Sequence, residues 1–291
     1  MAYTTIDNPE LFFQTLLHVG NNTSFTFAGS ENMQPDLIWN KNRDSSGYDH
    51  HIIDSVRGVS KLLRVSSTIG EFTSSDSITA IGSDGFTVGA DGNGYVASGT
   101  DKQVSWCWKE STTAGFDIVT YTGNGVEGRN ISHSLGAKPH WMIVKNRDSS
   151  VKWAVYHEKN TSAPGTDHLQ LNSDAATSDD DSTWDDTEPT SSVFRVKGSS
   201  ATNGSSVDYI AYLWAPIQGF SKFSSYTGNG NADGPFVYTG FKPAFVIAKL
   251  SSSSGGSWNI FDNKREGYNV DNDALFADVN GAETTTDYLD F

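Results

Sequence analysis

One phrase recurs along the chain, and its second copy reads Lys138-Pro139-His140-Trp141-Met142-Ile143-Val144-Lys145-Asn146-Arg147-Asp148-Ser149-Ser150. The first copy opens with Gln34-Pro35, and the third opens with Lys242-Pro243 and ends in a serine run. The three prolines are separated by 104 residues at each step. Solenoid repeats are about 20–50 residues long, whereas a unit of this length can bury a core of its own. The sequence therefore predicts tandem copies of one domain, arranged as beads joined by short connectors.

Further phrases keep the same frame. Tyr121-Thr122-Gly123-Asn124-Gly125 recurs as Tyr226-Thr227-Gly228-Asn229-Gly230, and Val104-Ser105-Trp106-Cys107-Trp108 matches Ile210-Ala211-Tyr212-Leu213-Trp214. The third copy reaches Phe291 without a counterpart of this late strand. We predict a first repeat over 1–114, a second over 115–219 and an incomplete third over 220–291. We expect either that the natural chain continues or that something else completes the third unit.

The composition predicts an all-β fold. Glycine and aromatic residues are abundant, with 28 glycines and eight tryptophans, and this balance favours half-buried strands joined by many turns. The apolar run 141–144 and the segment 153–157 flank a short polar turn and read as a hairpin, with counterparts around 52–54 and 258–262. We read 13–19 as a strand and Thr-Gly-Asn-Gly as a tight turn. We predict two packed antiparallel sheets in each unit, as in jelly-roll or lectin-like sandwiches.

Charge and motifs exclude several classes of function. A net charge of −15 repels nucleic acid phosphates, so we expect no nucleic-acid partner. No apolar run approaches the ~18 residues of a membrane span, so we expect no membrane insertion. The N-terminus carries no secretory signal pattern. The single cysteine, Cys107, excludes an intramolecular disulfide and reads as a buried apolar residue.

Four arginines are the candidate binding residues. Arg43 and Arg147 lie in the Lys-Asn-Arg-Asp-Ser-Ser segment, where a guanidinium could grip a sugar or a partner. Arg57 and Arg265 follow Asp54 and Asp262 in similar acid–Arg–Gly sets. The structural alternative is a turn in which Asn and Asp bind the local backbone and each arginine pairs with an acidic neighbour.

The acidic insert at 174–189 gives a further candidate, Trp184, which could stack on a ligand. The aspartates around it could hold Ca²⁺, but EF-hand spacing is absent, and a solvated acidic loop is the default. Asp271, Asp273 and Asp278 receive the same interpretation. Zinc, phosphate-loop and serine-hydrolase motifs are absent. We therefore predict no metal, no cofactor and no catalytic residue, and expect that the protein is not an enzyme.

A set of phrases is similar to tail and virion structural proteins of marine and cyanobacterial phages. They comprise Gln34-Pro35-Asp36-Leu37-Ile38-Trp39, Asp54-Ser55-Val56-Arg57-Gly58, Gly219-Phe220-Ser221-Lys222, Tyr226-Thr227-Gly228-Asn229-Gly230, Asp233-Gly234-Pro235-Phe236-Val237-Tyr238-Thr239-Gly240-Phe241 and Lys264-Arg265-Glu266-Gly267-Tyr268. The resemblance covers almost the whole chain. It implies a concanavalin-like sandwich and a place on the virion, commonly the tail, and it carries no catalytic residues.

These observations predict a phage tail fibre or tail-associated protein that aids host attachment through lectin-like modules. We expect assembly in the host cytoplasm, other virion proteins as partners, a homo-oligomer such as a trimer, and a host surface glycan as ligand. The alternatives are a non-viral carbohydrate-binding array, a capsid decoration protein and, less directly, a glycan-degrading enzyme. Functional differences should lie where the copies disagree, at the insert 174–189 and in the third unit.

Overall fold

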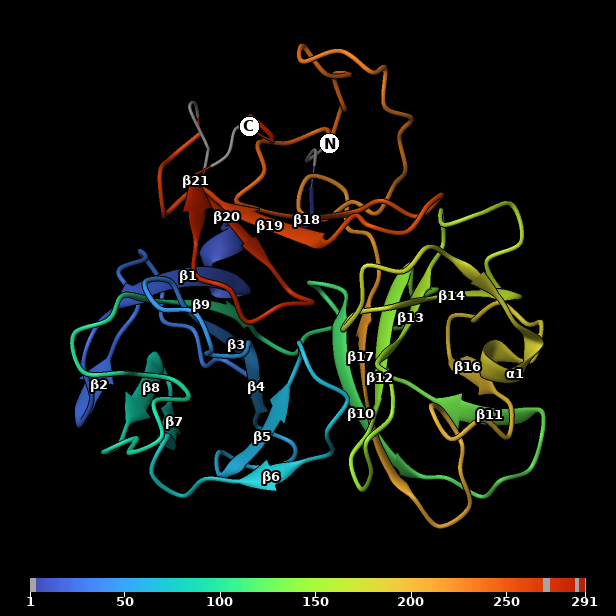
Figure 1. Ribbon diagram of the computed structural model, residues 1–291, viewed down its shortest axis with the longest axis horizontal. Coiled ribbons are helices and arrows are strands. Elements are labelled where there is room, and N and C mark those ends of the chain that lie inside the picture. Colours follow the sequence, from blue (N-terminus) through green and yellow to red (C-terminus); the bar gives the residue numbers. More distant parts are fainter. Residues whose placement is uncertain (1–3, 269–272, 286–287, 291) are drawn as a thin grey trace.

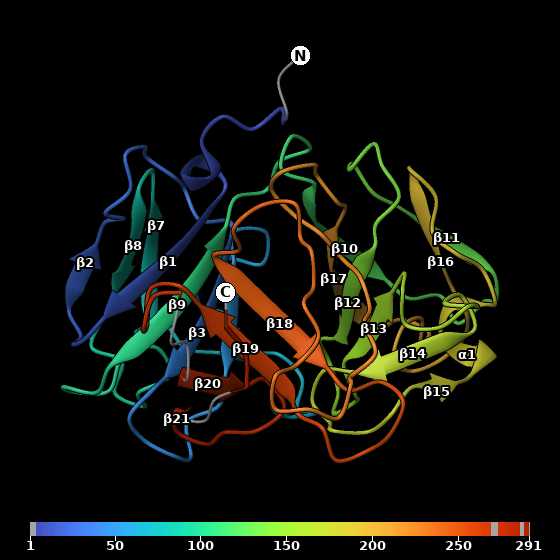
Figure 2. The same ribbon diagram turned by 90° about the horizontal axis from the view of Figure 1, so that it is seen from above.

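Three groups of strands surround one centre in the computed structural model, which describes residues 4–268, 273–285 and 288–290 (Figure 1). We name them unit 1, unit 2 and unit 3 after the predicted repeats. The first unit lies at the left of Figure 1, the second at the right and the third at the top. The same view turned by 90° shows β18 of unit 3 (Phe245–Lys249) lying between the sheets of the other two units (Figure 2).

Unit 1 is a sandwich of a six-stranded and a three-stranded antiparallel sheet. The larger sheet has the order β1-β9-β3-β4-β5-β6, and the smaller one has the order β2-β8-β7. A short 3-10 helix, Pro9–Leu11, precedes them, capped by the side chain of Asn8. The strand bounds are β1 Phe13–His18, β2 Thr23–Phe25, β3 Leu37–Asn42, β4 His51–Asp54, β5 Lys61–Arg64, β6 Phe72–Thr73, β7 Ile78–Gly82, β8 Gly85–Val88 and β9 Gln103–Trp108.

Unit 2 repeats this architecture. Its larger sheet has the order β10-β17-β12-β13-β14-β15, which matches unit 1 strand for strand, and β11 and β16 form the smaller sheet. The bounds are β10 Phe116–Thr122, β11 Arg129–Ser132, β12 Trp141–Asn146, β13 Ala154–His157, β14 Asp167–Gln170, β15 Ser178–Asp179, β16 Val193–Val196 and β17 Asp208–Trp214, with the helical turn α1 at Asp181–Trp184.

Unit 3 contains counterparts of four of the six strands of the larger sheet. Its four strands have the order β18-β19-β20-β21, and the last three are β19 Trp258–Asp262, β20 Asp273–Phe276 and β21 Thr284–Thr285. They correspond to β3-β4-β5-β6 of unit 1. Among the described residues no strand takes the place of β1 or β9 in this sheet.

The sandwich follows from apolar residues on both faces of the central strands. In β12, Trp141 and Ile143 point to one side, and Met142 and Val144 point to the other. The second pair packs with the small sheet of the same unit, around Phe194 and neighbouring residues. The same arrangement in unit 1 joins its large sheet to β2, β7 and β8. The predicted all-β fold of antiparallel sandwiches is confirmed.

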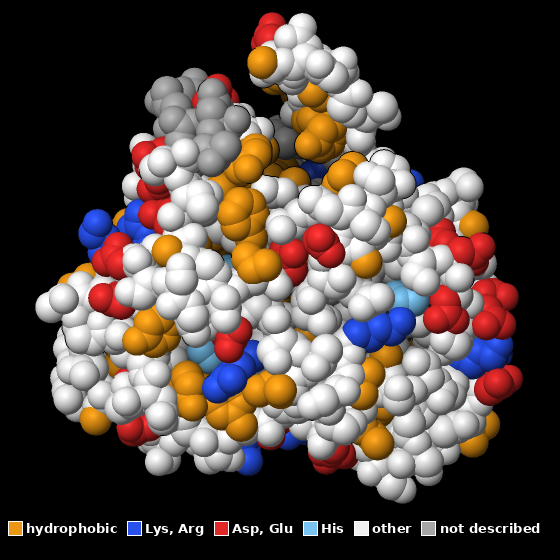
Figure 3. All heavy atoms as spheres, viewed as in Figure 1, with side chains coloured by type: hydrophobic (Ala, Val, Ile, Leu, Met, Phe, Trp, Pro, Cys, Tyr) orange, Lys and Arg blue, Asp and Glu red, His pale blue; other side chains and the backbone are white. Residues whose placement is uncertain are grey.

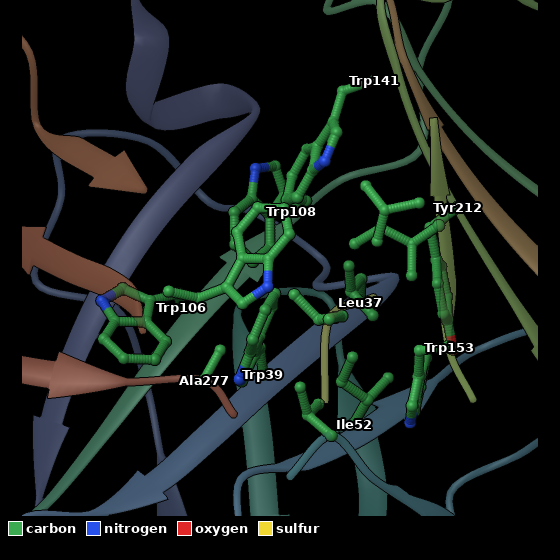
Figure 4. Close-up of a cluster of buried hydrophobic side chains, with 14 of the residues drawn as sticks. Leu37, Trp39, Ile52, Trp106, Trp108, Trp141, Trp153, Tyr212 and Ala277 are labelled. Carbon is green, nitrogen blue, oxygen red and sulfur yellow. The ribbon is translucent and has the colours of Figure 1, made fainter. Parts of the chain in front are cut away.

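The opposite faces of the three large sheets share one buried core, which we call the central core (Figure 4). Its members include Trp39, Trp106 and Leu63 from unit 1, Trp141, Trp153, Ile143 and Tyr212 from unit 2, and Trp258, Ile260 and Leu275 from unit 3. The expectation of separate beads is therefore wrong. Units 1 and 2 each have a small sheet over the outer face of the large sheet, but the inner faces of all three large sheets are covered only by one another.

Several local predictions are confirmed, and one is not. Residues 13–18 form β1, and Trp141 pairs with His157 in the predicted hairpin. The tight turn predicted at Thr-Gly-Asn-Gly of unit 2 is not formed, because residues 123–126 after β10 contain no turn, although Gly125 has a positive φ of 68°. Instead Gly123 lies against the backbone of unit 2, where an added Cβ would come within 2.1 Å of the Gly204 carbonyl oxygen.

Replacement of Trp258 by alanine tests the shared core. The ring is buried, and its Nε1 donates a 2.8 Å hydrogen bond to the carbonyl of Gln170 in unit 2. We expect Trp258→Ala to destabilise the whole chain by about 3–5 kcal/mol in urea unfolding, with one transition retained. Phe236→Ala, at a side chain 90% exposed in the same unit, is the matched control and should change little. A transition that splits, with most of its amplitude left at the wild-type midpoint, would contradict the shared core.

Candidate functional site: arginine clamps and two hollows

The repeated polar phrase Lys-Asn-Arg-Asp-Ser-Ser forms a turn at the end of β12. Asn146 accepts hydrogen bonds at its Oδ1 from the backbone N–H groups of Asp148 and Ser149, each at 3.0 Å. Asn42 accepts from Asp44 and Ser45 in the same way at the end of β3. In each copy the turn directs the arginine that follows the asparagine, Arg147 or Arg43, toward the neighbouring unit. The phrase therefore has the structural role that the sequence analysis set beside the binding role.

The four candidate arginines meet in pairs on two glutamates. Arg147 of unit 2 and Arg57 of unit 1 both contact Glu71, with Nε–Oε2 of 2.8 Å and Nη1–Oε2 of 3.1 Å respectively. Arg43 of unit 1 and Arg265 of unit 3 both contact Glu283, at 2.7 Å each. The two glutamates occupy equivalent positions, directly before β6 and β21. We call each set, one glutamate with its two arginines, an arginine clamp.

The clamps depress the pKa of both glutamates. Burial alone would raise the pKa of Glu71, but hydrogen bonds from Arg147 and the charge of Arg57 outweigh it, and the pKa lies below its usual value. The same balance lowers the pKa of Glu283, through Arg43 and Arg265. Both carboxylates are therefore held in the charged form.

Three equivalent backbone hydrogen bonds close the units into a ring. Glu71 donates its N–H to the carbonyl of Arg147, and Glu283 donates to the carbonyl of Arg43, at 2.6 and 2.8 Å. At the junction of units 2 and 3, Thr177 donates to Ser251 at 2.9 Å. Threonine and serine stand there in place of glutamate and arginine, so this third junction keeps the backbone bond without a clamp.

The arginines nearest the centre lie on buried aspartates that also contact a neighbouring unit. Arg57 Nε is 2.6 Å from Asp54 Oδ2, which accepts the Tyr212 hydroxyl of unit 2 at 2.6 Å. Arg265 and Asp262 repeat this pair at 2.6 Å, and Asp262 accepts from Trp106 Nε1 of unit 1 at 2.9 Å. The side chains of both Asp–Arg pairs are fully buried. The ion pair and the added hydrogen bond from the neighbouring unit offset the cost of removing these charges from water.

Trp184 and the acidic insert have structural places. The Trp184 ring is 1% exposed and packs in the outer core of unit 2, so it cannot stack on a ligand at the surface. Asp180 caps α1, and Asp181 pairs with Lys197 at 2.7 Å. Among the described residues no group of His, Cys, Asp or Glu side chains is arranged to hold a metal ion. Asp271 lies outside the described residues. Asp273 and Asp278 are buried rather than in a solvated loop, since Asp273 pairs with Arg43 at 3.3 Å and Asp278 accepts from the Trp258 N–H at 2.9 Å.

Two hollows lie at equivalent places in units 1 and 2, beside the clamps. The hollow of unit 2 measures about 290 Å³ and is lined by Thr120, Tyr121, Thr122, Arg147 and Asp208. The hollow of unit 1 measures about 300 Å³ and is lined by Leu17, His18, Val19, Arg43, Lys102 and Gln103. Each is formed by the end of β1 or β10, the start of β9 or β17, and the arginine after β3 or β12.

The hollow of unit 1 combines positive charge with an unused amide. Gln103 is 1% exposed, and neither its nitrogen nor its oxygen has a hydrogen-bond partner among the described residues. Burial lowers the pKa of His18 to about 3, so this ring is neutral; its Nε2 accepts from Asn40 Nδ2 at 3.3 Å, which leaves Nδ1–H as the ring nitrogen without a partner among the described residues. Arg43 and the exposed Lys102 border this hollow, and both have acidic partners, Arg43 with Glu283 at 2.7 Å and Lys102 with Asp44 at 3.9 Å. In the hollow of unit 2, the Thr122 hydroxyl donates to Asp208 at 2.7 Å, so this hollow has an acidic side chain in its lining where the hollow of unit 1 has none.

Sequence reasoning identified the arginines and missed their partners. Glu71 and Glu283 were not singled out, although they share a frame once four extra residues in unit 3 are allowed for. Gln103 and His18 had no motif to mark them. Lys41 and Lys145 also escaped notice, although both are fully buried beside the junctions, where burial lowers their pKa to about 8.

Residues 8–291 match a protein family described as a domain of unknown function, DUF7483. The chain belongs to this family. The match spans all three units, in agreement with a core that they share. No curated protein and no solved structure matches the chain.

Removal of either clamp glutamate should destabilise the ring. Glu71→Ala leaves Arg147 without its carboxylate, and Glu283→Ala leaves Arg43 with Asp273 alone, while Arg57 and Arg265 keep their aspartates. We expect a loss of about 3 kcal/mol in urea unfolding for both variants. Glu127→Ala, at an exposed carboxylate, should stay within about 0.5 kcal/mol of the wild type. If the two clamp variants unfold like the Glu127 variant, the clamps do not hold the units together.

The clamps also predict an acid dependence of stability. The folded pKa of both glutamates is below the ordinary value of 4.5, so their contribution is present above that pH and is lost as the pH falls through the folded values. We expect the melting temperature of the wild type to fall more steeply from pH 5 to pH 3 than that of the Glu71→Gln, Glu283→Gln double variant. Parallel melting curves across this range would exclude the proposed charge pairing.

Proposed function

We propose that this chain is a structural protein of a bacteriophage virion, located at the tail, where it aids attachment to the host surface. The observation that carries the proposal is that the repeated polar residues form contacts between the units. Arg147 and Arg43 join unit 1 to units 2 and 3 through glutamates that Arg57 and Arg265 also contact, and the resemblance of the repeated phrases to phage tail and virion proteins supplies the setting. A rigid ring of sandwiches suits an architectural part.

The internal repetition bears on the partners. Three units around one centre present similar surfaces three times, so one chain resembles a closed trimer in outline (Figure 1). We propose other virion proteins as its neighbours, with assembly in the host cytoplasm, and a homo-oligomer of such rings. None of the helices in the described residues is long and apolar enough to cross a membrane.

A non-enzymatic role is part of the proposal. The buried carboxylates Asp54 and Asp262 are bound by arginine and by an aromatic donor, so they are fixed as scaffold. The two hollows then supply weak, repeated contacts to a host glycan, and several rings on one particle would strengthen the attachment by multivalency. The same hollows also support the alternative of a carbohydrate-binding array outside a virion.

The test of the location is made on purified particles of the virus that encodes the chain. We expect the protein to copurify with intact particles and antibodies against it to label the tail in electron micrographs. Labelling of the capsid would favour the decoration alternative. Absence from washed particles, with the protein free in the lysate, would contradict a virion role.

The hollows give a prediction of their own on a glycan array. Lys102→Ala with Thr122→Val alters one wall of each hollow without touching a clamp arginine, and we expect the avidity for any recognised host glycan to fall at least tenfold. Lys159→Ala, an exposed lysine outside both hollows, is the control and should bind as the wild type does. If the hollow variant binds the glycan as strongly as the Lys159→Ala control does, the hollows do not take part in attachment.

A further inference from the structure

A tryptophan closes two of the junctions between units through the same hydrogen bond. Trp153 of unit 2 donates its Nε1–H to the carbonyl of Arg64 in unit 1 at 3.0 Å. Trp258 of unit 3 donates in the same way to the carbonyl of Gln170 in unit 2 at 2.8 Å. At each of these junctions a ring N–H thus reaches the end of β5 or β14 in the neighbouring unit.

The junction of units 1 and 3 has a histidine at this position. His50 precedes Asp54, which pairs with the start of β3, by four residues, and the two tryptophans have the same spacing in their units. The His50 ring interacts with the backbone of Phe276 in unit 3, the residue equivalent to Arg64 and Gln170. The contact is poorly aligned, since His50 Nε2 has no hydrogen bond of good geometry to any described residue. This junction therefore depends on an imidazole where the other two have an indole.

The imidazole of His50 is held in one neutral form. Trp39 Nε1 donates to His50 Nδ1 at 3.0 Å, so Nδ1 is the acceptor and the ring proton is on Nε2. The Trp106 ring lies nearly parallel to it, with the ring centroids 6.2 Å apart and 14° between the planes. Little histidine is visible on the face shown in Figure 3, and no part of His50 is exposed. The ring can reach a proton from solvent only when the junction opens.

A proton on His50 has no favourable place in the closed junction. It would enter at Nδ1, so the buried Trp39 N–H would lose its acceptor and would face a second donor. Burial lowers the pKa of His50, and the nearby charges of Lys41 and Arg265 lower it further. The neighbouring His51 acts in the same direction, and only the Phe276 backbone opposes these effects. Protonation of the imidazole therefore favours the open junction.

The carboxyl groups of the same junction add little in the range in which imidazole titrates. The pKa of Glu283 is below 4.5, so this clamp stays charged down to lower pH. Asp273 of β20 contacts Arg43 at 3.3 Å, and its pKa is raised to about 6 by burial and by the charges of Glu283 and Glu266. Both glutamates belong to unit 3 and remain beside Asp273 when the junction opens, so opening changes its pKa little.

We propose that His50 makes the junction of units 1 and 3 an acid-sensitive seam, which opens when the imidazole is protonated while the two junctions closed by tryptophan stay shut. The pKa of His50 in the closed seam is below its ordinary value of 6.5. Its contribution to closure is therefore complete above pH 6.5 and is lost as the pH falls below that value. The seam is a property of the ring itself and needs no virion setting.

The test is hydrogen exchange of the three equivalent amides that join the units, at pH 7 and pH 5, corrected for the intrinsic exchange rate. The Glu283 N–H reports on the junction of units 1 and 3, the Glu71 N–H on that of units 1 and 2, and the Thr177 N–H on that of units 2 and 3. An ordinary imidazole pKa in the open state makes the opening constant about 25-fold larger at pH 5 than at pH 7. We expect this acceleration at Glu283 alone, with the inner strands unchanged.

Two variants remove the titrating ring and keep the contacts. In His50→Gln the amide can accept from Trp39 and donate toward the Phe276 backbone, but it takes no proton in this range. His50→Trp supplies the residue found at the other two junctions. In both variants the acceleration at the Glu283 amide should fall below threefold, with circular dichroism at pH 7 as the check on the fold.

The matched control is His51→Gln. His51 is also buried, but its ring packs against Phe72 and Tyr95 within unit 1. This variant should keep the acid acceleration of the wild type at the Glu283 amide.

Three outcomes would overturn the seam. They are the same corrected rate for the Glu283 amide at both pH values, a similar acceleration at Glu71 and Thr177, and full acceleration retained in His50→Gln. The comparison of the three amides uses the wild-type chain alone, so it decides the question even if a variant does not fold.

Discussion

Strands that are apolar on both faces must be covered on both faces, and the rest of this structure follows from that constraint. In β12, Trp141 and Ile143 face one way while Met142 and Val144 face the other. A small second sheet covers the outer face in units 1 and 2. The inner face has no cover within its own unit, and three such faces meet in the central core. Burial of these large aromatic side chains is the main driving force for closing the ring.

The polar contacts decide which way the ring closes. A buried charge is tolerated when it is paired, and the loss of one partner is costly because the other charge is then left in a dry environment. Asp54, paired with Arg57, accepts a hydrogen bond from Tyr212 in β17 of unit 2. Asp262, paired with Arg265, accepts one from Trp106 in β9 of unit 1. An alternative packing of the three sheets would leave the two aspartates without these donors, and Arg147 and Arg43 without their glutamates. The clamps therefore specify the arrangement, while the aromatic core stabilises it.

The sequence predicted the sandwich but not its assembly. Turn residues and short apolar runs have local causes, so the hairpin of β12 and β13 and the strand at Phe13 could be located in advance. An apolar face looks the same whether its own unit or a neighbouring unit covers it, so the shared core had no local signal. The arginines were visible through their repetition. Glu71 and Glu283 were not, because four extra residues shift their frame and because each pairs with a residue far away in the chain.

The central claim is that the three units fold as one cooperative ring, and native-state hydrogen exchange of the slowest amides tests it most directly. The buried inner strands β4, β13 and β19 are the probes, one from each unit. The account predicts that all three strands exchange through the same global opening, with equal free energies that shift together in urea. Free energies that differ between the strands, with one unit opening while the others stay protected, would contradict it.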